Sequence, residues 1–167
     1  MIGNDIVDLA LARKESNWKR DRFLDKIFTK NEQLLIANAE NPEIMVWNLW
    51  SRKEAAYKIY NRETEIRGFF PLQLECFYEN ATLGTVSIKG KTYFTQSKIE
   101  NDSIYTIAVA KEKHFDRIIH IESNDEICKK NGVPYVVDFD SNKEKPISIS
   151  HHGRFWRAIS VMVYNLL

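Results

Sequence analysis

The chain has 167 residues, 44% of them apolar and 12% aromatic, which is enough to bury at least one sizeable core. Its 24 basic and 23 acidic residues nearly balance, and the sequence has no zinc-ligand spacing and no RNA-binding aromatic signature, so a nucleic-acid partner is not expected. Cys76 and Cys128 belong to no motif, which favours a reducing compartment over a disulfide framework. The acidic first residues do not resemble a signal peptide, and the apolar stretch 158–167 is shorter than the roughly 20 residues of a membrane span. We therefore expect a cytoplasmic protein without a membrane partner.

The first part of the chain predicts one strand followed by helices. A β-like run covers residues 2–9, and residues 11–30 place apolar positions at mixed helical spacing among dense charge. Thr29 and Glu32 form a capping-box pattern that predicts a helix running to about residue 39. Pro42 can occupy the first turn of a longer helix, whose apolar spacing continues to about residue 61.

After residue 68 the pattern changes to short β-rich runs. Residues 72–78 alternate apolar and polar, and the segments 85–88, 91–98 and 104–110 continue this pattern, which predicts an antiparallel meander. The remaining elements that we expect are a strand at 117–122, a helix at 123–131, a polar loop at 138–145, and strands at 147–150 and 156–164. Runs of helices followed by runs of strands predict an α+β fold rather than an α/β fold.

Two segments in the first half carry side chains suited to chemistry. Asp5 and Asp8 interrupt an apolar strand; they are either solvated carboxylates or part of a hard-cation site, since Mg²⁺ favours one or two carboxylates. Within the helical segment 50–58, Glu54 and Lys58 lie one turn apart and therefore on the same face. They form either an ordinary surface ion pair or a functional one.

Two further segments have both a plain and a functional interpretation. Residues 148–153, Ser-Ile-Ser-His-His-Gly, can cradle a phosphate or simply face water at a strand end. A Ser-His hydrolase is disfavoured, because there is no Gly-x-Ser-x-Gly elbow and neighbouring strand residues point in opposite directions. Residues 13–30 carry seven basic and three acidic side chains, which form either a solvated helix face or a docking surface for an acidic partner.

Taken in this order, the segments resemble the 4′-phosphopantetheinyl transferase superfamily. Its members carry a Gly-x-Asp strand, a Trp/Phe-x-x-Lys-Glu-(Ala/Ser)-x-x-Lys helix and a (Ser/Asn)-x-Ser-His turn. The matching segments are Gly3-x-Asp5, Trp50-x-x-Lys53-Glu54-Ala55-x-x-Lys58 and Ser148-x-Ser150-His151, with a weaker match at the helix start Phe28–Glu32. The resemblance implies an α+β fold of that family, with antiparallel sheets packed against helices.

The order of the motifs bears on the assembly. A Ser-His turn at the end of the chain resembles the small holo-acyl-carrier-protein synthases, which assemble as trimers, whereas residues 132–155 resemble the first lobe of the surfactin-type pseudo-dimers. We therefore favour a permuted pseudo-dimer, a monomer with lobes at 1–113 and 114–167, over a trimer. Two positions depart from the surfactin-type pattern, because Val133 replaces a lysine and Val7 replaces a second carboxylate.

The resemblance implies transfer of 4′-phosphopantetheine from coenzyme A to a serine of an apo acyl or peptidyl carrier protein, with release of adenosine 3′,5′-bisphosphate. The changed Gly-Val-Pro segment and the short second lobe leave an alternative open, a carrier-binding module that has lost catalysis. The residues implied are Asp5 and Glu54 as Mg²⁺ ligands, Glu54 and Lys58 as catalytic groups, Lys53, Ser150 and His151 as ligands of coenzyme A phosphates, and Arg13 and Arg20 as carrier-binding residues.

Overall fold

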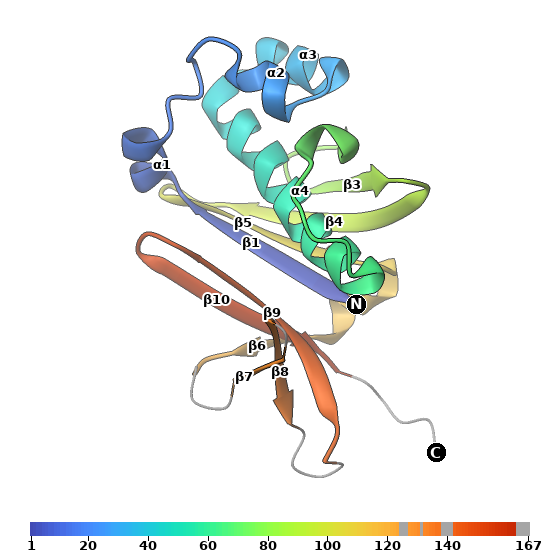
Figure 1. The fold of residues 1–167 in the computed structure, drawn as a ribbon. Helices are drawn as coiled ribbons and strands as arrows, with labels where there is room; N and C mark the ends of the chain where they lie inside the picture. The colour runs from blue at the N-terminus through green and yellow to red at the C-terminus, as the bar shows by residue number, and fades with distance from the viewer. Residues whose placement is uncertain (124–126, 131, 138–141, 163–167) are drawn as a thin grey trace.

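Two five-stranded antiparallel sheets lie against each other, and helices cover the outer side of the first sheet (Figure 1). The structure is a computed structural model that describes residues 1–123, 127–130, 132–137 and 142–162. The strand order is β1-β5-β4-β3-β2 in the first sheet and β6-β10-β9-β8-β7 in the second. The α+β class with antiparallel sheets and helices, which the sequence predicted, is confirmed.

The first sheet contains the predicted first strand and the predicted meander. A short 3₁₀ helix, η1 (Pro71–Gln73), precedes β2, so the alternating run begins as a turn rather than as a strand. Strand β1 pairs only with β5 and therefore forms one edge of this sheet. The strands are β1 (Ile2–Asp8), β2 (Glu75–Tyr78), β3 (Leu83–Ile88), β4 (Lys91–Ile99) and β5 (Ser103–Val109).

Four α-helices lie between β1 and β2, namely α1 (Leu9–Glu15), α2 (Phe23–Ile27), α3 (Lys30–Asn38) and α4 (Pro42–Thr64). The predicted capping box opens α3: the Thr29 hydroxyl accepts from the Glu32 backbone, and the Thr29 backbone N–H donates to the Glu32 carboxylate at 2.8 Å. Pro42 is the first residue of α4, as expected. Helix α4 packs its apolar side on the first sheet and forms the main core. Within the described residues, no helix is both long and apolar enough to cross a bilayer.

The second sheet corrects the prediction in two places. The helix expected at 123–131 is wrong where the structure describes it, because Cys128–Lys130 pair with Val133–Tyr135 as neighbouring strands. The loop expected at 138–145 is wrong at its end, because Glu144 and Lys145 belong to a strand and pair with Val137 and Val136. Residues 124–126, 131 and 138–141 lie outside the described residues. The elements are η2 (Glu112–Arg117), β6 (Ile118–Ile121), β7 (Cys128–Lys130), β8 (Val133–Val137), β9 (Glu144–His152) and β10 (Phe155–Val161).

The second sheet repeats the pairing of the first. Thr95 pairs with Ala108, and Ile147 pairs with Ser160, so the paired positions from Thr95 to Ala108 in the β4–β5 hairpin have counterparts 52 residues later in β9–β10. Likewise Ile2 pairs with Val109 and Ile118 with Val161, so positions of β1 have counterparts 116 residues later in β6. The sheets differ in what joins their first two strands: α1–α4 stand between β1 and β2, whereas residues 122–127 join β6 to β7. The predicted lobe boundary at residue 113 falls within η2, the connection between the sheets.

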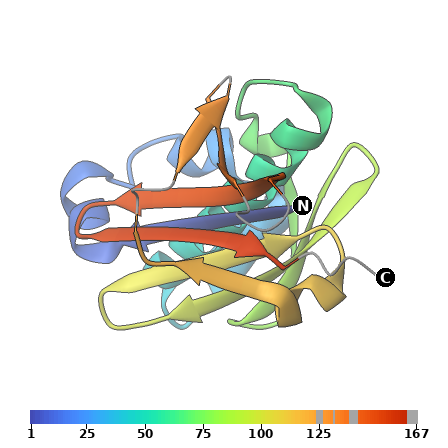
Figure 2. The same cartoon turned by 90° about the horizontal axis from the view of Figure 1, so that it is seen from below.

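Strand β1 lies between α4 on one side and the β9–β10 hairpin on the other, as the two views show together (Figures 1 and 2). Gly3 permits the approach to α4, because a Cβ atom at this position would collide with the carbonyl oxygen of Ala55. The Gly-x-Asp pattern therefore has a steric basis: the glycine brings the helix close to the strand that carries Asp5.

Candidate active site

A cavity of about 280 Å³ opens where β1, α1, α4 and the end of β9 meet. Asp5 of β1, Glu54 and Trp50 of α4, and His151 and His152 of β9 line it. Three segments that lie far apart in the sequence, and that the sequence singled out separately, thus contribute to one cavity.

Side chains of β9 complete the hydrogen bonding of β1. As an edge strand, β1 has outward N–H groups that would otherwise remain unpaired in a buried position. Successive inward-facing residues of β9 accept from alternate N–H groups of β1, as the two-residue period of both strands requires. The bonds are Asn4 N to Ser148 Oγ (2.9 Å), Ile6 N to Ser150 Oγ (3.0 Å) and Asp8 N to His152 Nδ1 (2.8 Å).

Helix α4 places Lys58 against the same strand. Its ammonium group donates to the carbonyl oxygens of Asn4 (2.6 Å) and Ile149 (3.1 Å) and lies 3.8 Å from Asp5 Oδ1. The lysine therefore connects β1 to β9 while its charge stays beside the Asp5 carboxylate. Glu54 lies one helical turn earlier on the same face.

The two carboxylates of the cavity share a low-dielectric environment. Burial raises the pKa of Asp5, and the neighbouring Lys58 ammonium partly offsets this rise. Burial, together with the negative charge of Asp5, raises the pKa of Glu54 to about 7. One oxygen of Asp5, Oδ1, accepts from Ser150 Oγ at 3.2 Å. The other, Oδ2, is buried and has no hydrogen-bond partner among the described residues.

This donor set fits a hard cation. A divalent ion would relieve the repulsion between Asp5 and Glu54 and would give the unpartnered Oδ2 atom a ligand to bind. The described residues contain no group of three or more His, Cys, Asp or Glu side chains arranged around one point. The remaining ligands of such an ion would therefore come from water or from phosphate oxygens, as is common for Mg²⁺.

Comparison with known proteins places this site in a family. A family model described as the 4′-phosphopantetheinyl transferase superfamily matches residues 1–110. The chain belongs to this superfamily. The match covers β1 to β5, including Asp5, Glu54 and Lys58, and ends before the second sheet.

Two curated relatives and one solved structure extend this comparison. A holo-[acyl-carrier-protein] synthase of Protochlamydia amoebophila is 39% identical over 59 residues, which are 34% of this chain and 47% of the relative, so the match spans about half of that protein. A holo-[acyl-carrier-protein] synthase of Caldanaerobacter subterraneus is 31% identical over 90 residues, 54% of this chain and 68% of the relative. The Helicobacter pylori holo-[acyl-carrier-protein] synthase in complex with coenzyme A superposes with a TM-score of 0.52 at 16% identity. That superposition covers 65% of this chain and 98% of the other, and it shows a shared fold.

Within this transferase-superfamily site, Asp8 lies apart from the cavity carboxylates. It caps α1 by accepting from the Ala10 and Leu11 backbone, and it accepts further bonds from the backbone and the guanidinium of Arg154. These bonds hold the pKa of Asp8 well below its usual range. The Asp8 carboxylate thus already accepts several hydrogen bonds from N–H groups. Through these bonds it links the β9–β10 turn to the start of α1.

Lys53 does not line the cavity, although the family resemblance implied that it would bind a coenzyme A phosphate. Its side chain is fully buried, forms a 2.6 Å ion pair with Glu32 and donates to the carbonyl oxygens of Ile27 and Pro71. Because successive helical residues are turned by about 100°, a helix that presents Glu54 and Lys58 to β1 turns Lys53 toward α2 and α3. The contacts of Lys53 therefore indicate a structural role, in which it joins α4 to α2 and α3.

Ser150 and His151 lie next to each other on β9 but differ in environment. Ser150 is buried, and its hydroxyl is already engaged by the Ile6 N–H and by Asp5. His151 points the other way, is exposed and lines the cavity. Only His151 of this pair is open to a ligand in the structure as it stands.

The two arginines singled out for carrier binding are both on the surface near α1 and α2. Arg13 forms a bidentate ion pair with Glu43, with nitrogen–oxygen distances of 3.0–3.1 Å, so its charge is already matched. The Arg20 guanidinium lies 5.2 Å from the centre of the Phe23 ring. Arg20 has no ion pair among the residues that the structure describes.

The structure also shows residues beside the candidate site that the sequence analysis did not identify. Arg62 lies one helical turn beyond Lys58, donates to the Ile147 carbonyl at 2.6 Å and has a buried Nη1 without a hydrogen-bond partner in the described residues. It lines a second cavity of about 510 Å³ together with Arg67, Lys130 and Tyr135. The spacing of Glu54, Lys58 and Arg62 by four residues was the available signal, since such residues share one face.

Proposed function

We propose that this protein transfers the 4′-phosphopantetheine arm of coenzyme A to a serine hydroxyl of an apo acyl or peptidyl carrier protein. In this reaction the serine oxygen bonds to the β-phosphorus, and the bond from that phosphorus to adenosine 3′,5′-bisphosphate breaks. One observation carries the proposal: Glu54 and Asp5 line the same cavity, and the Lys58 ammonium lies 3.8 Å from Asp5, all within the segment matched to the superfamily. The names of the curated relatives support the same activity.

Asp5 and Glu54 are the residues that would hold a magnesium ion. When bound, the ion would neutralise negative charge on the pyrophosphate, which is the main electrostatic demand of phosphoryl transfer. Removal of a proton from both carboxylates is required before they bind a cation, so we expect metal affinity to increase with pH through the titration of Glu54 near pH 7.

Glu54 and Lys58 would perform two different tasks. A carboxylate whose pKa is about 7 suits a general base at neutral pH, and Glu54 would accept the serine proton directly or through a water molecule. Lys58 is anchored by two backbone carbonyl groups, so its positive charge is fixed in place and can offset charge on the departing phosphate without reorganisation.

Coenzyme A would extend along β9 from the candidate active site to the cavity beside Arg62. His151 lines the first cavity, and Arg62, Arg67, Lys130 and Tyr135 line the second. Guanidinium and ammonium groups suit phosphates, and the tyrosine ring suits a nucleobase. We assign the phosphates to His151 and to these cations, in place of Lys53.

The carrier protein would dock beside α1 and α2, because the basic segment 13–30 lies next to the cavity and an acidic helix would complement it. Arg20 has the more available charge, since Glu43 already neutralises Arg13. We further propose that segments 1–113 and 114–167 are two lobes of one monomeric catalytic unit, on the evidence of the repeated strand pairing.

The experiment is intact-mass spectrometry of an apo acyl carrier protein incubated with this protein, coenzyme A and Mg²⁺. We expect a mass gain of one phosphopantetheine unit, lost on chelation and in Glu54→Gln. Glu40→Gln, which removes an exposed carboxylate outside the cavity, is the matched control and should retain the gain. Carrier binding without any mass gain, with several apo carriers, would refute the transferase and support the binding module.

A further inference from the structure

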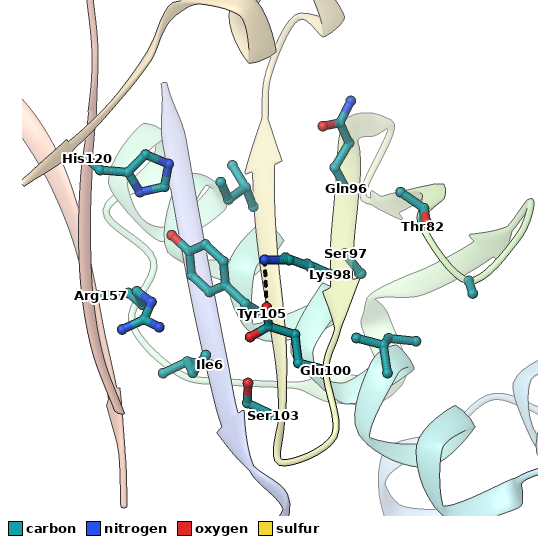
Figure 3. Close-up of a pocket in the computed structure, with 13 residues that line it drawn as sticks. Ile6, Thr82, Gln96, Ser97, Lys98, Glu100, Ser103, Tyr105, His120 and Arg157 are labelled. Atoms are coloured by element: carbon teal, nitrogen blue, oxygen red, sulfur yellow. Dashed lines mark ion pairs between the residues drawn. The ribbon is translucent and has the colours of Figure 1, made fainter. Parts of the chain in front are cut away.

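A separate cavity of about 720 Å³ lies between the two sheets, and neither Asp5 nor Glu54 lines it. Its walls come from β4 and β5 on one side and from β6 and β10 on the other (Figure 3). This volume is within the range of small-molecule sites, roughly 300–1,000 Å³. The site proposed for the transfer reaction makes no use of it.

The repeated strand pairing shows how this cavity differs from the candidate active site. By the offsets between the two sheets, Arg157 occupies the position of Tyr105, and His120 occupies the position of Asn4. The counterpart of Asp5 is Ile121, and the described residues between β6 and β7 contain no counterpart of α4. The second sheet therefore lacks both metal-binding carboxylates and places an arginine and a histidine at the wall of the cavity.

Three hydrogen-bond donors gather on one side of the cavity. Figure 3 shows the Tyr105 hydroxyl on the side where Arg157 and His120 lie. The Arg157 guanidinium donates one bond, to the Trp156 carbonyl at 2.9 Å, and forms no ion pair within the described part of the chain. Burial raises the pKa of Tyr105 to about 12, so its hydroxyl keeps a proton to donate at neutral pH.

The Asn4 side chain links Tyr105 to the backbone of Arg157. Its buried side-chain amide donates both to the Tyr105 hydroxyl and to the Arg157 carbonyl oxygen, each at 3.2 Å. Because Tyr105 belongs to the first sheet and Arg157 to the second, this one amide fixes the two walls relative to each other. The hydroxyl of Tyr105 accepts in this bond, which leaves its hydrogen for a ligand.

The lining also has an apolar part and few negative charges. Glu100 is the one carboxylate among the lining residues, and Lys98 already binds it at 2.6 Å. Ile6, Ile99 and Ile107 supply apolar surface. We propose that the cavity binds an amphipathic organic anion, with a carboxylate or phosphate on Arg157 and Tyr105 and an apolar body against the isoleucines.

The test is NMR titration of ¹⁵N-labelled protein with octanoate and, separately, with phenyl phosphate. These probes distinguish a carboxylate on an acyl chain from a phosphate on a ring, and phenol is the uncharged control. We expect saturable shifts at the amides of β4, β5 and β10 for at least one anion and much weaker binding of phenol. Arg157→Gln should weaken binding about tenfold or more, because a bond to a charged group is lost.

Three further variants are compared with wild type in the same titration. Tyr105→Phe should weaken binding severalfold, Arg157→Lys should restore part of it, and Lys113→Gln, an exposed cation outside the cavity, should leave it unchanged. Thermal unfolding of each variant identifies any that fail to fold. Equal binding by folded Arg157→Gln, absence of binding by both anions, or displacement of the probe by saturating coenzyme A would overturn a separate anion site.

Discussion

Replacement of Glu54 by Gln should stabilise the protein in the absence of metal, and should do so more strongly at high pH. Burial and Asp5 raise the pKa of Glu54 from 4.5 to about 7, so the unfolded chain releases this proton first as pH rises. Stability is therefore lost between about pH 4.5 and pH 7, the opposite of the usual behaviour of a salt-bridged carboxylate. At pH 8, where Glu54 is ionised in both states, a pKa difference of about 2.5 units corresponds to roughly 3 kcal/mol.

The assay is urea unfolding of wild type and Glu54→Gln at pH 5 and pH 8 with a chelator present. We expect the variant to gain about 3 kcal/mol in free energy of unfolding at pH 8 and less than about 1 kcal/mol at pH 5. Added Mg²⁺ should stabilise wild type more than the variant. Glu40→Gln provides the matched control, with no pH-dependent difference expected. A gain of equal size at both pH values, or a loss at pH 8, would refute the account of two crowded carboxylates.

Three further changes test the packing around β1 and α4, each by chemical denaturation. Gly3→Ala places a methyl group against the backbone of α4 and should cost about 1–3 kcal/mol, with reduced transfer activity. Lys53→Met leaves the Glu32 carboxylate buried without its partner and should cost about 3–5 kcal/mol, whereas replacing both residues by apolar ones should cost much less. Ser148→Ala leaves a buried N–H of β1 unpaired and should cost about 1–3 kcal/mol; Ser87→Ala, at a solvent-exposed hydrogen bond, should stay within about 0.5 kcal/mol.

The elements that the sequence predicted correctly are those whose signals are local. The capping box at Thr29 and Glu32 and the proline at the start of α4 act within one helical turn, and the meander depends on alternation within each strand. The helix prediction for Cys128–Lys130 was wrong because the structure of this segment does not depend on a local signal. Its strand exists because of pairing with β8, and a three-residue stretch carries too little pattern of its own to predict that pairing.

Some of the predicted residues lie together in the structure, whereas the surroundings of others were not predictable from the sequence. Gly3, Asp5, Glu54 and Lys58 converge as the motifs indicated. The burial of Ser150 and the arginine that binds Asp8 depend on contacts across about 145 residues, which no local pattern contains. Lys53 is different, since helical geometry alone separates it from its neighbour Glu54.

The contacts of β1 explain why the second sheet is needed by a site whose two carboxylates lie outside it, on β1 and on α4. Without β9, three buried N–H groups of an edge strand would lose their acceptors, and Lys58 would lose one of its two carbonyl partners. Each unpaired buried group costs about 1–3 kcal/mol, so the loss would be comparable to the whole stability of a small domain. The strand that carries Asp5 is therefore positioned by both sheets. A mutation in β9 outside any substrate contact should therefore still change the pKa of Glu54, because it shifts the Asp5 carboxylate whose charge acts on Glu54.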